Sequence, residues 1–145
     1  MQNSEFEKLV NGLCLETIDM NGGHTFLHRH ISDEELMKRV KNSNILAATV
    51  FDIEDNDVLE YAKKALLEFE PDLIDWLNDD KDEEDYVAYF NAGVPIGPGY
   101  YKAKWHEWKN GPVECDTIAV VCRKRDRKYD STFKVVSLFP MNEIN

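Results

Sequence analysis

The 145-residue sequence predicts an α+β fold in which N-terminal helices pack on a C-terminal antiparallel β-sheet. Apolar residues recur at spacings of three and four in the first half, whereas the second half contains short β-rich runs. The runs "TIAVVCRK" and "FKVVSLF" flank the polar turn "RDRKYDS", which predicts an antiparallel hairpin. Hydrophobic residues make up 43% of the chain, enough for a core, and we expect one domain over residues 1–145.

Three helical regions are predicted in the first half. Residues 4–14 carry apolar side chains at helical spacing, and the helix stops near Gly12. Ser32 caps the next helix, and Glu35 three positions later completes a capping box. A long helix opens at Asp55-Asn56, and Pro71 either kinks it or starts a second segment.

Strands are predicted over residues 45–51 and 86–90, with the second one closed by the loop "NAGVPIGPG". Residues 100–109, "YYKAKWHEWK", alternate loosely, as an exposed strand does, and either stack RNA bases or turn their aromatic side chains into the core. His106 in this run is a candidate second acid–base group. The run "RKRDRK" over residues 123–128 is either a solvated turn or a patch that attracts phosphate.

The net charge of -11 is unevenly distributed. Residues 54–85 contain 14 acidic and 3 basic residues, whereas residues 100–134 contain 9 basic and 5 acidic ones. An RNA groove on the C-terminal third therefore remains compatible with the composition. The acidic stretch is interpreted as a solvated helix face, with docking of a partner protein as the alternative.

The chain has no apolar run that approaches the roughly 20 residues needed to span a bilayer. Its N-terminus lacks the basic start and apolar stretch of a signal peptide, so we expect a soluble cytoplasmic protein without a membrane partner. Cys14, Cys115 and Cys122 show no CxxC spacing, which argues against a disulfide framework and against a thiolate zinc site.

Three of the four histidines lie in seven consecutive positions, residues 24–30, inside the segment "NGGHTFLHRHISDEEL". His24, His28 and His30 allow three interpretations: structural histidines, metal ligands, or an acid–base site. His24 and His28 would share a helix face as metal ligands, but they need a further ligand. Histidine titrates near neutral pH, and Arg39 on the following helix is a candidate cation for catalysis. The spacing does not decide among the three.

The segments "GGHT", "RHI" and "SDEELMKRV" resemble the opening of the ribonuclease A-like toxin domain of bacterial contact-dependent inhibition (CdiA C-terminal) proteins. The similarity continues through "AATVFD", "WLND", "NAGVPIG" and "FKVVSLFP", and so covers residues 22–140. The resemblance implies a ribonuclease A-like fold without disulfides. It also implies RNA cleavage without a metal or other cofactor, by 2′-hydroxyl attack that leaves a 2′,3′-cyclic phosphate.

The same resemblance assigns the central roles. His30 corresponds to the catalytic histidine, as base or acid, and Arg39 corresponds to the catalytic arginine. Ser137 takes the place of a threonine that contacts phosphate, and Phe139 takes the place of a substrate-contacting tyrosine. Phe139 has no hydroxyl, so the chain is either an active nuclease or a catalytically decayed relative that binds RNA or a protein.

The segment between "RHI" and "SDEEL" is shorter here than in the family. Another alignment puts Arg29 at the catalytic position, with His24 and then His28 as the next candidates for the base. Thr25 and His28 are further candidates for substrate binding. The implied partners are RNA, with tRNA as one candidate, and an immunity protein, whereas DNA is not expected.

Overall fold

The computed structural model describes residues 2–15, 18, 32–42, 45–125 and 133–142. It confirms the α+β class, with most helices before most strands. The elements in chain order are α1 (Asn3–Asn11), α3 (Asp33–Lys41), β1 (Ala47–Thr49), α4 (Asp55–Glu68), α5 (Glu70–Asn78), β2 (Tyr86–Asn91), β3 (Gly97–Tyr101), the 3-10 helix η1 (Lys102–Asn110), β4 (Val113–Cys115), β5 (Thr117–Lys124) and β6 (Phe133–Met141). Among the described residues, no helix is long and apolar enough to cross a membrane.

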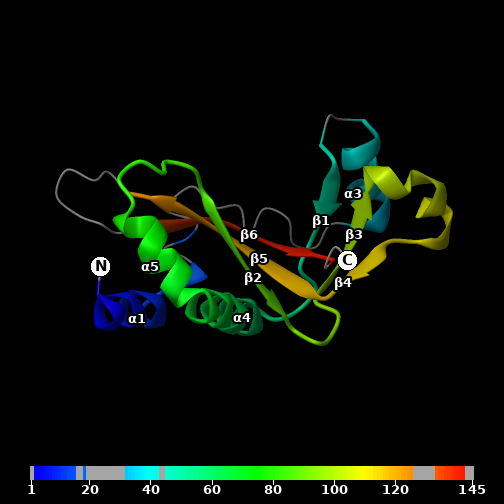
Figure 1. Ribbon diagram of the computed structural model, residues 1–145. Coiled ribbons are helices and arrows are strands. Elements are labelled where there is room, and N and C mark those ends of the chain that lie inside the picture. Colours follow the sequence, from blue (N-terminus) through cyan, green and yellow to red (C-terminus); the bar gives the residue numbers. More distant parts are fainter. Residues whose placement is uncertain (1, 16–17, 19–31, 43–44, 126–132, 143–145) are drawn as a thin grey trace.

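Within the described residues, the strands form two antiparallel sheets of three strands each (Figure 1). The larger sheet has the order β2-β5-β6, and the smaller sheet has the order β1-β3-β4. A single residue, Asp116, separates β4 from β5, so the chain passes directly from the smaller sheet into the larger one. The antiparallel pairing of β5 with β6 confirms the predicted hairpin.

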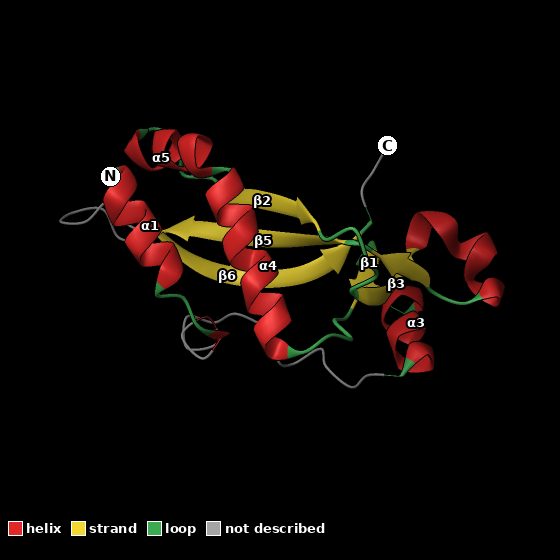
Figure 2. Ribbon diagram, turned by 90° about the horizontal axis from the view of Figure 1, so that it is seen from below, coloured by secondary structure: helices red, strands yellow, loops and turns green. Residues whose placement is uncertain are grey.

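Helices α1, α4 and α5 cover one face of the larger sheet (Figure 2). Their apolar positions follow the helical period, as expected for elements that bury one face. The Phe6 ring stacks on Phe133 with 5.8 Å between centroids, which joins α1 to β6. The large side chains buried in this core include Phe6, Ile18, Leu66, Leu73, Ile118, Val120 and Phe133.

Helix α3 packs on the smaller sheet and forms a second, smaller core. Its buried residues are Leu36, Val40, Ala48, Val50 and Tyr100. The Ser32 hydroxyl accepts a hydrogen bond from the Glu35 backbone N–H at 3.2 Å, which confirms the predicted N-cap. The two cores lie on opposite sides of the junction between the sheets.

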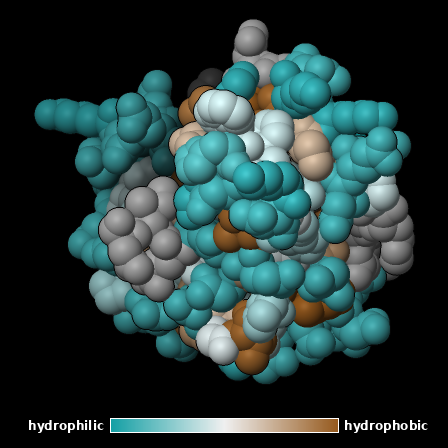
Figure 3. All heavy atoms as spheres, turned by 90° about the vertical axis from the view of Figure 1, so that its right-hand side faces the viewer, coloured by the Kyte–Doolittle hydropathy of each residue, from teal (hydrophilic) through white to brown (hydrophobic). Residues whose placement is uncertain are grey.

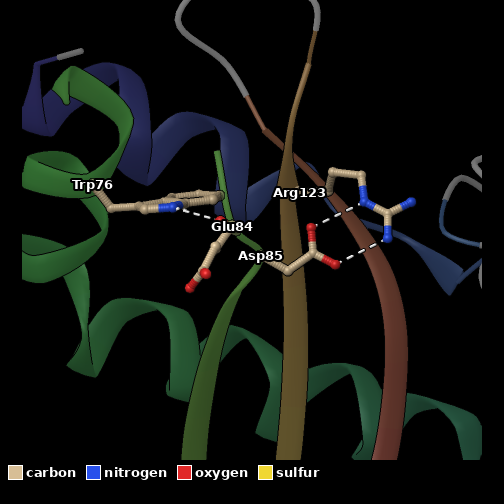
Figure 4. A network of polar contacts seen from close by, with 4 residues as sticks. All are labelled: Trp76, Glu84, Asp85 and Arg123. Carbon is tan, nitrogen blue, oxygen red and sulfur yellow. Dashed lines mark hydrogen bonds and ion pairs between the residues drawn. The ribbon is translucent and has the colours of Figure 1, made fainter. Parts of the chain in front are cut away.

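The turn between α5 and β2 is fastened to the end of β5 (Figure 4). Arg123 donates from Nε and Nη2 to the two carboxylate oxygens of Asp85 at 3.0 and 2.9 Å. This hydrogen bonding holds the pKa of Asp85 below its usual value. The Trp76 indole N–H donates to the Glu84 carbonyl at 2.9 Å. The acidic turn is therefore fixed by its neighbours as well as exposed to solvent.

Lys124 makes a second connection to the same turn. Its Nζ donates to the Asp79 carbonyl at 2.7 Å and also to the Asp82 carbonyl. It also lies 5.0 Å from the centroid of the Trp76 ring, within cation–π range. Arg123 and Lys124 thus have partners within the molecule. Residues 126–128 of the predicted phosphate-attracting patch lie outside the described residues, so the patch stays a prediction.

Two predictions of secondary structure are wrong. Residues 102–110 form the helix η1 where an exposed strand was expected, and the Trp108 indole N–H closes this segment by donating to the Tyr101 carbonyl at 3.0 Å. Strand β3 begins at Gly97, inside the expected loop. A Cβ at Gly97 would lie 1.8 Å from the Val50 carbonyl oxygen, so glycine permits the close approach of these two segments.

Candidate functional site

A pocket of about 450 Å³ lies where the two sheets meet. One wall of the pocket is formed by helix α3, strands β1 and β3 and the segment before β1. The other wall is formed by β2 and β6. A volume of this size is in the range of pockets that hold small ligands. The lining residues are Leu36, Arg39, Ile45, Ala47, Ala48, Thr49, Tyr89, Tyr101, Ser137, Leu138, Phe139, Pro140 and Met141.

Arg39 reaches the pocket from the second half of α3. Leu36 lies three positions earlier and lines the same pocket, as expected for neighbours on one helix face. Leu36 is buried in the smaller core and holds this face against the sheet, while Arg39 is exposed. A guanidinium is a cation that offers donors in a planar fork. Arg39 can therefore bring a cation with several donors to the pocket wall.

Ser137 and Phe139 enter the pocket from β6. They pair with Val121 and Ala119 of β5 and, being two residues apart, point to the same face of the sheet. A register shift beside Val121 places one extra residue in β6 just before Ser137. The structure therefore brings Arg39, Ser137 and Phe139 to one pocket, with the two β6 residues on the same face of their strand.

Tyr89 lines the pocket but was not a candidate from the sequence. It pairs with Ala119, which on its other side pairs with Phe139, so the three residues form one row across the larger sheet. Tyr89 is identified as a pocket residue by the register in which the strands pair. A local sequence pattern does not contain this register.

Tyr101 is a second lining residue that sequence reasoning missed. Its hydroxyl accepts a hydrogen bond from the Asn142 backbone N–H at 3.0 Å and lies 3.8 Å from Cys115 Sγ. Burial raises the pKa of Tyr101 to about 12, so the phenol keeps its proton at pH values above the usual pKa of tyrosine. Because Tyr101 belongs to the smaller sheet and Asn142 follows β6, this bond joins the two sheets beside the pocket.

The other residues predicted for the site belong to the histidine-rich segment, residues 24–30, and to the run over residues 100–109. His24, Thr25, His28 and His30 lie outside the described residues, so the choice among structural, metal and acid–base histidines is not tested. Within the part of the chain that the structure describes, no group of three or more His, Cys, Asp or Glu side chains could hold a metal ion. His106 is exposed on η1, with its ring edge-on to Trp105 at 6.1 Å.

The two tryptophans of η1 have opposite environments. Trp108 packs edge-on against Tyr100 of the smaller core, whereas Trp105 is 70% exposed. Figure 3 views this side of the molecule and shows a mainly hydrophilic surface with separate hydrophobic patches. Of the two alternatives for this run, packing into the core holds for Trp108, and Trp105 remains available for contact with a partner.

No protein-family model matches the chain, and neither does any curated protein. A chain in the crystal structure of the CdiA-CT/CdiI complex from Y. kristensenii 33638 matches with a TM-score of 0.66 and 15% sequence identity. The match covers 81% of this chain and 97% of that chain. At this identity the likeness shows the fold alone. The fold is therefore similar to that of a chain in a CdiA-CT/CdiI complex.

Proposed function

We propose that residues 1–145 form a metal-independent ribonuclease domain of the toxin type, which cleaves RNA through a 2′,3′-cyclic phosphate. The observation that carries this proposal is the meeting of Arg39 and Ser137 in one pocket between the sheets. The likeness to a chain of the CdiA-CT/CdiI structure supports a toxin-type fold for this domain.

The proposed chemistry assigns one task to each group. His30 removes the proton of the 2′-hydroxyl, whose oxygen attacks phosphorus and displaces the 5′-oxygen of the next nucleotide. Arg39 donates to the phosphate oxygens on which negative charge develops, and two parallel donors suit this better than one. The Ser137 hydroxyl donates a further hydrogen bond. The leaving oxygen takes up a proton from water or from another of the histidines.

A catalytically decayed relative is the second candidate, and one observation favours it. Phe139 stands beside Ser137 in the pocket with an apolar ring, which has no proton to give. Such a domain would still bind RNA, or a protein, through the same pocket.

We further propose a protein partner of the immunity type, because the matching chain comes from a structure that contains a CdiA-CT/CdiI complex. The acidic faces of α4 and α5 are a candidate surface for this partner, since a strongly charged face favours association with a complementary one.

Cleavage of total tRNA and of a labelled oligoribonucleotide in the presence of EDTA tests the nuclease. The parent protein should cut both and leave cyclic phosphate ends. His30→Ala should lose about 100-fold or more of the activity, because general base catalysis commonly contributes 10²- to 10⁴-fold. Ser137→Ala should lose about tenfold, in keeping with one hydrogen bond to a charged group.

Matched variants separate the histidines. His24→Ala and His28→Ala should keep most of the activity if His30 is the base, and loss in one of them instead would transfer the role to that residue. Activity that disappears in EDTA and returns with a divalent metal would favour the metal alternative. A folded parent that leaves both RNAs intact at micromolar concentration would contradict the nuclease and favour the decayed relative.

A further inference from the structure

Two aromatic side chains lie in the same row on one wall of the pocket. Tyr89 of β2 and Phe139 of β6 each pair with Ala119 of β5, which places both on the same face of the larger sheet. They are 42% and 36% exposed, whereas Phe133 of the same sheet is 2% exposed. Core formation therefore does not account for their full ring surfaces.

Ala119 explains how the two rings can form one surface. The two strands that carry them are about 10 Å apart, twice the usual spacing of neighbouring strands. Ala119 fills the position between them with a methyl group, and it is 0% exposed. Of these three residues, only the two aromatic ones line the pocket. A larger side chain at position 119 would separate the rings, whereas alanine lets them form an apolar floor.

The polar lining residues define what this floor can receive. Arg39, Thr49 and Ser137 bring a guanidinium and two hydroxyl groups to the same pocket. A nucleotide combines a flat aromatic base with an anionic phosphate, and so matches an apolar floor beside a cation and hydroxyl donors. An apolar protein side chain would use the floor but would make no use of the cation and the hydroxyl groups.

We propose that Tyr89 and Phe139 form a nucleobase-binding subsite, on which one base of single-stranded RNA stacks. The inference takes its ligand class from the proposed function, but it concerns binding and does not require cleavage. It also gives Phe139 a role that needs no hydroxyl. Stacking uses the ring face, so phenylalanine and tyrosine serve equally at both positions.

The test uses a 2′-O-methyl hexanucleotide, which has no free 2′-hydroxyl and so binds without being cut. Its counterpart is an abasic oligomer of the same length and charge. The parent should bind the base-containing ligand more tightly. Tyr89→Leu and Phe139→Leu should each weaken that binding about 5- to 100-fold and leave the abasic ligand unaffected, because one stacked base contributes in this range. Tyr89→Phe and Phe139→Tyr should bind like the parent.

Trp105→Leu is the matched control, because it removes an exposed aromatic residue that does not line the pocket. Circular dichroism checks that all variants are folded. Parental affinity in both leucine variants would overturn the inference, as would equal weakening for the two ligands. Loss confined to Trp105→Leu would move base stacking to η1. A parent that fails to cut RNA but shows the predicted base-selective binding would reject the nuclease and keep this subsite.

Discussion

Position 39 shows how much of the proposed chemistry depends on a single side chain. A lysine there would keep the positive charge, but its ammonium is a point charge and lacks the planar fork of donors. A comparison of arginine and lysine at position 39 therefore distinguishes simple charge neutralisation from directed hydrogen bonding to a phosphate.

We expect Arg39→Ala to lower kcat/KM for RNA cleavage about 100- to 1000-fold, the usual effect of removing a preorganised donor to a developing charge. Arg39→Lys should recover part of this loss, because the charge returns without the fork. Steady-state cleavage of an oligoribonucleotide in EDTA measures both effects.

The neighbouring residue supplies the control. Lys38 lies on the same helix, pairs with Glu34 at 3.6 Å and does not line the pocket. Lys38→Ala removes the same charge and should change kcat/KM less than about threefold, the effect of a surface charge. An equal loss of kcat/KM in Lys38→Ala and Arg39→Ala would mean that this helix attracts RNA by its charge and does not contact the substrate in the pocket.

At the residue scale, the sequence predicts the part of the pocket that depends on local spacing. Ser137 and Phe139 are two positions apart in a strand, so their common face follows from the chain alone. Tyr89 and Tyr101 could not be predicted in the same way. Their place depends on which strands pair and in what register, and tertiary packing decides that.

At the element scale, η1 shows why an alternating pattern of aromatic and polar residues misleads. The pattern in residues 100–109 fits an exposed strand, but the strand pairing of β3 stops at Tyr101. The Trp108 indole then donates to the Tyr101 carbonyl and its ring packs on Tyr100, so the segment folds back on the end of β3 instead of continuing the strand. The helices α1, α3, α4 and α5 were predictable because the apolar period lies within each segment, and α3 also has its Ser32 cap.

Because the two tryptophans of η1 lie in different environments, their replacement should change the stability of the protein by different amounts. Trp108→Ala should lower the free energy of unfolding by about 2–3 kcal/mol, somewhat less than for a fully buried tryptophan because Trp108 is half-buried. Trp105→Ala should change it by less than about 0.5 kcal/mol, as for most surface residues. Urea denaturation of both variants beside the parent measures these differences. Similar losses for the two would show that η1 is not anchored through Trp108.

At the scale of the whole molecule, the pocket exists because the two sheets keep a fixed relation to each other. The chain crosses between them at Asp116, and the hydrogen bond from the Asn142 N–H to the Tyr101 hydroxyl closes the junction again beside the pocket. Cys115 lies at the same junction, and burial raises its pKa to about 11. Two weakly acidic groups are therefore held neutral where the sheets meet.

This arrangement predicts a loss of stability at alkaline pH. In the unfolded chain a tyrosine ionises near pH 10, whereas folded Tyr101 keeps its proton up to about pH 12. The contribution of Tyr101 is thus fully present below pH 10 and is lost as the pH rises to 12, because only the unfolded state releases the proton in that window. Urea denaturation at intervals from pH 7 to pH 12 should show this decline.

Tyr101→Phe isolates the effect from the other tyrosines. At neutral pH the variant should be less stable by about 1 kcal/mol, since the Asn142 N–H loses its partner. Between pH 10 and 12 its stability should fall less steeply than that of the parent, so the two curves should converge. Tyr86 and Tyr100, whose pKa values burial also raises, remain in both proteins and cancel in the comparison. Parallel curves over this range would contradict the role of Tyr101 as the neutral phenol that joins the sheets.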